Sequence, residues 1–125
     1  MSSDEPLVHL DEIERRCVQR YIASLTSRLR GNLVEVWLFG SAARGDMWSA
    51  RLPMHSDIDV LALTERPVAD PLQEELVNET YGLFLECGRQ IAPTFKVATE
   101  FHHSTEAKLQ AFRQRVWEEG RRLFP

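Results

Sequence analysis

Apolar side chains recur at helical spacing over residues 11–30, with Arg and Glu between them, and this pattern predicts an amphipathic helix. Asp11, followed three residues later by Glu14, has the form of a capping box at the start of the helix, and Gly31 is a suitable end. The stripe expected to face the core comprises Ile13, Cys17, Val18, Tyr21, Ile22, Leu25 and Leu29.

Two strands are predicted after this helix. Residues 33–39 are rich in β-branched and aromatic side chains and end at Gly40, so we expect a largely buried strand. A short helical turn from Ser41 and an irregular loop over residues 46–55 lead to the second strand, residues 57–63. On this strand Ile58, Val60 and Ala62 should face one way, and Asp57, Asp59 and Leu61 the other.

The C-terminal half is predicted to hold two helices and one further strand. Asp70 as N-cap, with Pro71 and Gln73 after it, starts a helix that continues to about Cys87. Residues 90–98 are predicted to form a strand, in which Pro93 favours an edge position or a bulge. Residues 104–119 are predicted to form the last helix. The buried positions expected on the two helices are Leu72, Leu76, Thr80, Leu83, Phe84, Leu109, Phe112 and Val116.

The order of these elements, α-β-(turn)-β-α-β-α, indicates an α+β fold with a small mixed sheet flanked by helices. A length of 125 residues fits a single domain over residues 1–125, and no repeat or linker divides the chain. The net charge of −4 argues against broad binding to a nucleic-acid backbone, which depends on Lys and Arg. A small anionic ligand fits this charge if a metal ion supplies positive charge locally.

We expect a reduced, cytoplasmic protein without membrane contact. The first residues lack a basic segment followed by an apolar run, so no signal peptide is predicted. No apolar stretch approaches the roughly 18 residues that a membrane span needs. Cys17 and Cys87 lack metal-ligand spacing, and Cys17 is expected to be a small buried side chain on the apolar stripe.

The end of the first strand carries the first candidate for chemistry. Gly40, directly after a buried strand, lets the backbone turn sharply and lets a ligand come close. If Ser41 begins a helical turn, unpaired backbone N–H groups favour an anion such as phosphate, with the Ser41 hydroxyl and the Arg44 charge nearby. A turn of this kind without any ligand is the alternative.

The start of the second strand carries the other candidate. Asp57 and Asp59 project from the same face, about 6–7 Å apart along the strand, so their carboxylates can converge on hard cations. Two carboxylates, water and phosphate oxygens make the oxygen shell that Mg²⁺ prefers. Strands disfavour Asp, and like charges on one face repel, so a bound cation would offset a local cost. A solvated edge strand with unliganded aspartates is the alternative.

Both halves occur in the order of a known signature. Residues 40–45, Gly-Ser-Ala-Ala-Arg-Gly, followed by Ser56-Asp57-Ile58-Asp59, closely resemble the motif of the polymerase-beta-like nucleotidyltransferase superfamily. Within it, the chain is similar to the minimal nucleotidyltransferases, which are single domains of about this length. The resemblance extends from the first strand to the end of the chain, but its specificity lies in positions 40–60.

The resemblance implies roles for individual residues. Gly40 and Ser41 would bind the terminal phosphates of a nucleotide, usually ATP, and Asp57 and Asp59 would be the catalytic Mg²⁺ ligands. Arg44 and Gly45 would shape the loop of the nucleotide site, which also includes Ser56. Family members transfer a nucleotide to a small molecule, a nucleic acid or a protein. Some are encoded beside a helical toxin and act as its antitoxin, in some cases by transferring AMP onto it.

Two departures from the family pattern affect these expectations. The loop between Gly45 and Ser56 is several residues longer than in the family and is expected to be a tolerated surface insertion, or else a cover or partner contact. Catalytic members also carry a third carboxylate on the next strand, where residues 91–99 contain neither Asp nor Glu. Glu100, at the end of that strand, is the candidate replacement.

Two functions are therefore expected from the sequence. The first is a Mg²⁺-dependent enzyme that transfers AMP from ATP to a hydroxyl acceptor, supplied by a toxin-like partner or a homodimer mate. The second is a binding module of the same fold that neutralises a helical toxin, because without a third carboxylate general-base chemistry weakens. His102 and His103 are expected to be solvated in a polar turn.

Overall fold

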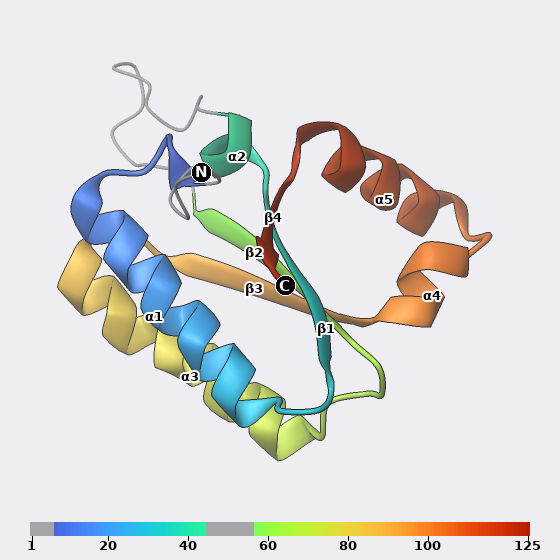
Figure 1. Cartoon of the computed structure of the whole chain (residues 1–125), viewed down its shortest axis with the longest axis horizontal. Coiled ribbons are helices and arrows are strands. Elements are labelled where there is room, and N and C mark those ends of the chain that lie inside the picture. The colour runs from blue at the N-terminus through green and yellow to red at the C-terminus, as the bar shows by residue number, and fades with distance from the viewer. Residues whose placement is uncertain (1–6, 45–56) are drawn as a thin grey trace.

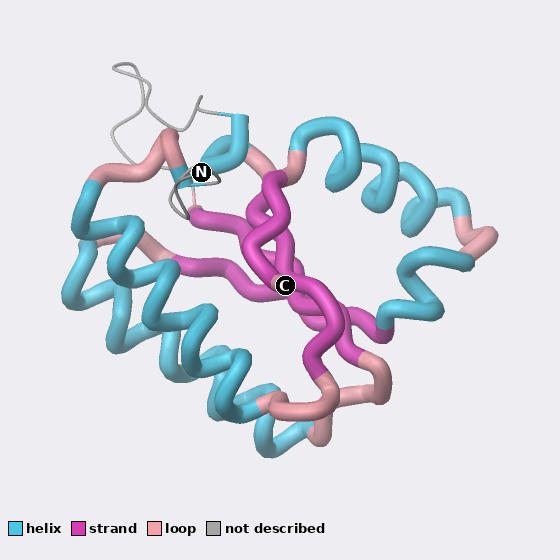
Figure 2. Tube along the Cα trace, viewed as in Figure 1, coloured by secondary structure: helices cyan, strands magenta, loops and turns pink. Residues whose placement is uncertain are grey.

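The computed structural model describes residues 7–44 and 57–125. A four-stranded sheet in the order β3-β2-β1-β4 lies between two helical layers, with α1 and α3 on one side and α4 and α5 on the other (Figures 1 and 2). Strand β1 is antiparallel to β2 and β4, whereas β2 and β3 are parallel. The predicted mixed sheet flanked by helices is confirmed.

The first half of the described chain contains α1 (Glu12–Arg28), β1 (Leu33–Phe39) and α2 (Ser41–Arg44). The capping box at α1 is confirmed, since Asp11 accepts from the Glu14 amide at 2.7 Å and Glu14 accepts from the Asp11 amide at 2.9 Å. Cys17 is buried on the predicted stripe, but Ile13 is 55% exposed because the buried face starts at Glu14 instead.

The centre of the chain contains β2 (Ile58–Thr64), α3 (Asp70–Cys87) and β3 (Ile91–Val97). β3 is an edge strand, as Pro93 suggested. Two details of the α3 prediction are wrong. Ala69 rather than Asp70 is the N-cap, with no side-chain cap, and Phe84 is 44% exposed because Leu76, Thr80 and Leu83 form the buried face.

The C-terminal part contains α4 (Ala98–His103), α5 (Ala107–Glu119) and β4 (Arg121–Phe124). The sequence prediction is wrong here in two respects. Residues 98–103 form a helix directly after β3 instead of the end of a strand and a polar turn, and residues 121–124 form a strand that the prediction lacked. α4 forms because Ala98 and Phe101 are buried against the sheet, and β4 forms by pairing with β1.

Each face of the sheet has its own core. The face toward α1 and α3 carries Val36, Leu38, Ile58, Val60 and Ala62. The opposite face carries Trp37, Phe39, Leu61 and Leu63, which pack with Phe101, Phe112 and Val116 of α4 and α5. This alternation is the one predicted for residues 58–62. Among the described residues, every helix is too short or too polar to cross a bilayer.

Candidate functional site

The two halves of the predicted motif meet at one end of the sheet. Phe39, the last residue of β1, pairs with Asp59 near the start of β2, so Gly40 lies directly beside Asp59. α2 begins immediately after this glycine, and the amides of Ala43 and Arg44 both donate to the Gly40 carbonyl at 3.1 Å. Antiparallel pairing thus brings together residues that are 19 positions apart.

Gly40 is required for this close approach. Its φ of 71° lies in the left-handed region, which side chains disfavour. A Cβ on residue 40 would lie 2.4 Å from Asp59 Oδ2, which is closer than real Cβ contacts allow. We expected the glycine to leave room for a ligand. In the structure the carboxylate of Asp59 takes that space.

Asp59 has an unusual electrostatic environment. Burial and the charge of the neighbouring Asp57 raise the pKa of Asp59 to about 6, and the charge of Arg44 partly counteracts them. Asp57 itself is exposed. The carboxylate of Asp59 has no hydrogen bond to any residue that the structure describes. The carboxylate is therefore partly desolvated and only partly compensated by the charge of Arg44, which is a situation that a bound cation would relieve.

Arg44 lies at the same end of the sheet and contacts a residue that the sequence did not indicate. Its Nη1 donates to Glu119 Oε2 at 2.9 Å, which joins α2 to the end of α5. No sequence motif marks Glu119, because α5 reaches this place only through the pairing of β4 with β1.

The strand next to Asp59 carries no acidic side chain facing the site. In the parallel register Ala92 is the partner of Asp59, and Thr94 and Lys96 follow on the same face. Glu100 lies beyond the opposite end of β3, in α4, at least five residues or roughly 17 Å along the strand from Asp59. The structure therefore does not bring Glu100 to the site as a third carboxylate.

Other predicted site residues lie outside the described residues. These are Gly45 and Ser56, together with the loop expected over residues 46–55. The backbone of Ser41 is described as the first residue of α2, and its side chain is not.

The chemistry of the two aspartates fits Mg²⁺ held jointly with a phosphate ligand. Mg²⁺ is usually bound by one or two carboxylates plus substrate oxygens and water, rather than by an all-protein cage. In the described part of the chain, no three His, Cys, Asp or Glu side chains gather as a metal cage would need. Among the described residues, Asp57 and Asp59 are therefore the two that would hold the ion.

A second polar cluster lies on the same face of the sheet, toward the other end. Glu35 is 8% exposed; one of its oxygens accepts from Trp37 Nε1 at 3.1 Å, and the other is 2.8 Å from His102 Nε2. Arg122 Nη2 lies 3.4 Å from Glu35 Oε1. His102 also stacks on Trp117, with ring centroids 5.9 Å apart. His102 is thus part of a packed cluster, and its expected place in a solvated turn is wrong.

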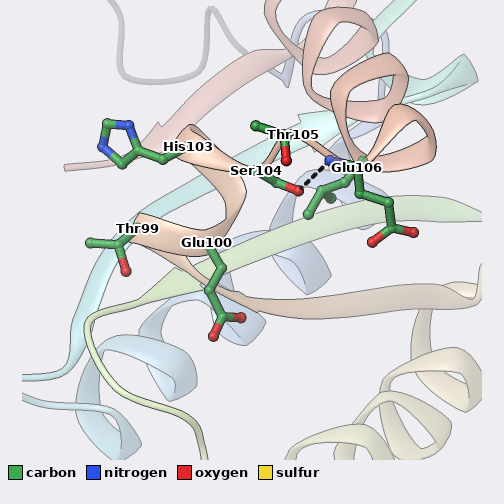
Figure 3. Close-up of a pocket in the computed structure, with 7 residues that line it drawn as sticks. Thr99, Glu100, His103, Ser104, Thr105 and Glu106 are labelled. Carbon is green, nitrogen blue, oxygen red and sulfur yellow. Dashed lines mark hydrogen bonds between the residues drawn. The ribbon is translucent and has the colours of Figure 1, made fainter.

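A cavity of about 560 Å³ lies at the junction of α4 and α5. Its lining consists of Thr99, Glu100, His103, Ser104, Thr105, Glu106 and Leu109. Figure 3 shows that His103, Glu100 and Glu106 point in different directions, and the Glu106 amide donates to Ser104 Oγ at 3.1 Å. These side chains do not converge on one centre, so this cavity offers no alternative to the site at Asp59.

The family model described as "Nucleotidyltransferase domain" matches residues 18–123, which is most of the chain. None of the curated proteins matches the chain.

Solved structures of low sequence identity share the fold. One is a variant of the MntA-HpeT toxin-antitoxin with a tyrosine replaced by alanine, at 21% identity and a TM-score of 0.54, covering 85% of this chain and 71% of that one. Another is a toxin-antitoxin with AMP-PNP, at 19% identity and a TM-score of 0.54, covering 85% of this chain and 72% of that one.

Proposed function

The chain belongs to the nucleotidyltransferase domain family, and from this premise we propose that it transfers AMP from ATP to a hydroxyl acceptor and releases pyrophosphate in a Mg²⁺-dependent reaction. The observation that carries the proposal is the contact between Gly40 and Asp59, in which the Asp59 carboxylate occupies the space of a missing Cβ. The contact supports the proposal because Gly40 and Asp59, the residues proposed for the phosphate turn and for the metal, are neighbours.

In this proposal each residue of the motif has a separate task. The backbone at Gly40 and Ser41 receives the terminal phosphates, and Arg44 adds positive charge beside them. Asp57 and Asp59 hold Mg²⁺, and Asp59 must give up its proton to do so. When bound, the ion neutralises charge on the phosphates and orients them. Gly45 and Ser56 complete the nucleotide site.

For the acceptor we propose a hydroxyl on a small helical toxin protein in the cytoplasm. Two of the structurally similar chains are toxin-antitoxin proteins, and one of them is described with the nucleotide analogue AMP-PNP. The fold is shared at 19–21% identity, so the partner and the nucleotide are proposals for this chain. A homodimer mate is the other source of an acceptor.

A second candidate function is a binding module that neutralises the toxin without transferring a nucleotide. It is favoured by the third strand, where Ala92, Thr94 and Lys96 share the face of Asp59 and none can act as a carboxylate base. Nucleotide binding would survive in such a protein.

The proposal is tested by calorimetric titration of ATP with and without Mg²⁺. Asp57→Asn/Asp59→Asn should abolish the Mg²⁺-dependent part of the binding. Glu100→Gln is the matched control, because it removes a carboxylate at the far end of the sheet and should leave binding unchanged. Unchanged binding in the double variant would rule out the metal role of the two aspartates.

Transfer is tested separately with α-labelled ATP and purified candidate partners, or the protein alone. Label on a partner that depends on Asp59 supports the enzyme. Nucleotide binding with no label on any partner leaves the binding module as the function.

A further inference from the structure

The end of α5 lies at the same end of the sheet as the motif. Arg121, two residues after Glu119, pairs with Leu38 on one side of β1, and Phe39 pairs with Asp59 on the other side. Figure 1 shows the end of α5 and the short helix α2 at this common end. The sheet therefore carries Glu119 to the motif, although nothing in the sequence near Glu119 indicates a site.

The position of Glu119 is held by its neighbours. The Gly120 amide donates to the Val116 carbonyl at 2.7 Å, and Val116 is fully buried. A Cβ on Gly120 would lie 3.2 Å from Trp37 Cε3, so the chain passes closely over β1 as it leaves the helix. Glu119 is thus attached to a packed part of the fold rather than to a loop.

Glu119 uses this position to hold Arg44. The ion pair, at 2.9 Å, joins Glu119, whose side chain is 33% exposed, to Arg44, whose side chain is 38% exposed. Ion pairs with this much exposure contribute little to stability, so the main consequence is geometric. The contact favours the orientation of the long Arg44 side chain in which its guanidinium meets Glu119 at the end of α5.

The restrained guanidinium also acts on the metal-binding end of the site, since its charge reaches Asp59. We propose that Glu119 is a positioning residue, which holds the guanidinium of Arg44 ready for the phosphates of the nucleotide. This inference rests on the proposed nucleotide site and adds a residue that the family motif does not contain.

The chemistry of arginine explains why the phosphates are the expected target. A guanidinium presents five N–H donors in a planar fork that matches phosphate oxygens. An arginine restrained in advance loses less rotamer freedom when the phosphates bind, which strengthens binding. The contribution of Glu119 to nucleotide affinity should therefore depend on the terminal phosphates and be small for AMP.

Glu119→Gln and its matched control Glu118→Gln test the proposal. Glu118 is the next residue on α5, carries the same charge and accepts from Gln114 at 2.7 Å. Calorimetric titration with Mg²⁺ and AMP-PNP should show affinity weakened about three- to tenfold by Glu119→Gln and changed less than about twofold by Glu118→Gln. AMP should bind all three proteins alike, which a general disturbance of the fold would not produce.

A double-mutant cycle with Arg44→Ala completes the test. If Glu119 acts through Arg44, Glu119→Gln should cause no further loss in the Arg44→Ala background. Additive losses, or equal effects of the two glutamine variants, would overturn this inference alone. A parent protein that binds no nucleotide would overturn the proposed function and this inference together.

Discussion

Two carboxylates on the same face of the sheet have opposite environments. Glu35 on β1 and Asp59 on β2 lie about 13 Å apart along the strands, as the pairing of Glu35 with Leu63 places them. Glu35 is contacted by Trp37 and His102 and lies beside Arg122. Asp59 has no hydrogen-bond donor among the described residues, and another aspartate lies two positions away.

The pKa values of the two groups shift in opposite directions for this reason. Burial raises the pKa of Glu35, but its hydrogen bonds and the charges beside it outweigh burial and lower the pKa overall. At Asp59 burial and the Asp57 charge together raise the pKa to about 6. The fold satisfies the charge of Glu35 by itself. Among the described residues Arg44 alone counteracts the raised pKa of Asp59, and burial and the Asp57 charge outweigh it.

The largest difference is expected in nucleotide binding. Asp59→Asn should weaken Mg²⁺-dependent binding of ATP roughly 100-fold or more, because an amide replaces a charged metal ligand. Glu35→Gln should change it less than about twofold, because Glu35 lies toward the other end of the sheet. Calorimetric titration of both variants checks this. Similar losses of affinity in both would show that Asp59 has no greater role in nucleotide binding than Glu35.

The second difference is expected in stability. Glu35→Ala should lower the free energy of unfolding by about 2–3 kcal/mol, since it leaves the donors around a buried carboxylate without their acceptor. Asp59→Ala should not lower it, because no donor of the described residues depends on Asp59. Urea unfolding of both variants measures the two values. An equal loss at Asp59 would mean that the fold, and not a ligand, satisfies that carboxylate.

The contact between Gly40 and Asp59 is tested by Gly40→Ala, with Gly88→Ala as the matched control. Both glycines have φ near 71°, so the backbone strain of roughly 1–2 kcal/mol should be common to both. Only at Gly40 would the new Cβ meet another atom, Asp59 Oδ2, while Gly88 faces open space. Gly40→Ala should therefore be the more destabilising and should alone weaken nucleotide binding. Equal effects in both assays would show that the contact has no consequence.

The smallest effect is expected in the pH dependence of stability without Mg²⁺ or nucleotide. Between about pH 4 and 6 the folded state holds a proton on Asp59 that the unfolded state has lost, so stability falls as pH rises through this window. Asp59→Asn should remove this loss of stability, and the variant should be more stable than the parent at pH 7.5 by on the order of 1 kcal/mol, allowing for solvent screening.

Glu35 behaves oppositely, because its pKa is lowered. Its contribution to stability is present above about pH 4.5 and is lost at lower pH. Thermal unfolding across pH 3–8 measures both trends. If the stability of the parent does not change with pH near pH 5, the pKa of Asp59 is not raised.

Local patterns predicted most of the regular elements because local physics determines them. The capping box of Asp11 and Glu14 is made by residues three apart, and the alternation along residues 58–62 follows from the two-residue period of a strand. The predicted positions of α1, β1, β2, α3 and β3 hold to within a few residues.

Predictions failed where a tertiary partner determined the local structure. Residues 98–103 form a helix because Phe101 fills the core between the sheet and α5. His102 is held by Glu35, 67 residues away, and no local signal could indicate that contact. β4 has four residues and forms only because β1 offers a free edge.

The sequence by itself determined the family, the mixed α+β fold and the two candidate halves of a site, because the Gly-Ser turn and the Asp-x-Asp strand are local patterns. Only the tertiary structure decided which residues meet. The register of β1 against β2 puts Asp59 into the space above Gly40, and the pairing of β4 brings Glu119 to Arg44. The register of β3 against β2 leaves Glu100 beyond the opposite end of β3 from Asp59. Register depends on how whole strands pack, so contacts across 19 or 75 residues cannot be obtained from spacing alone.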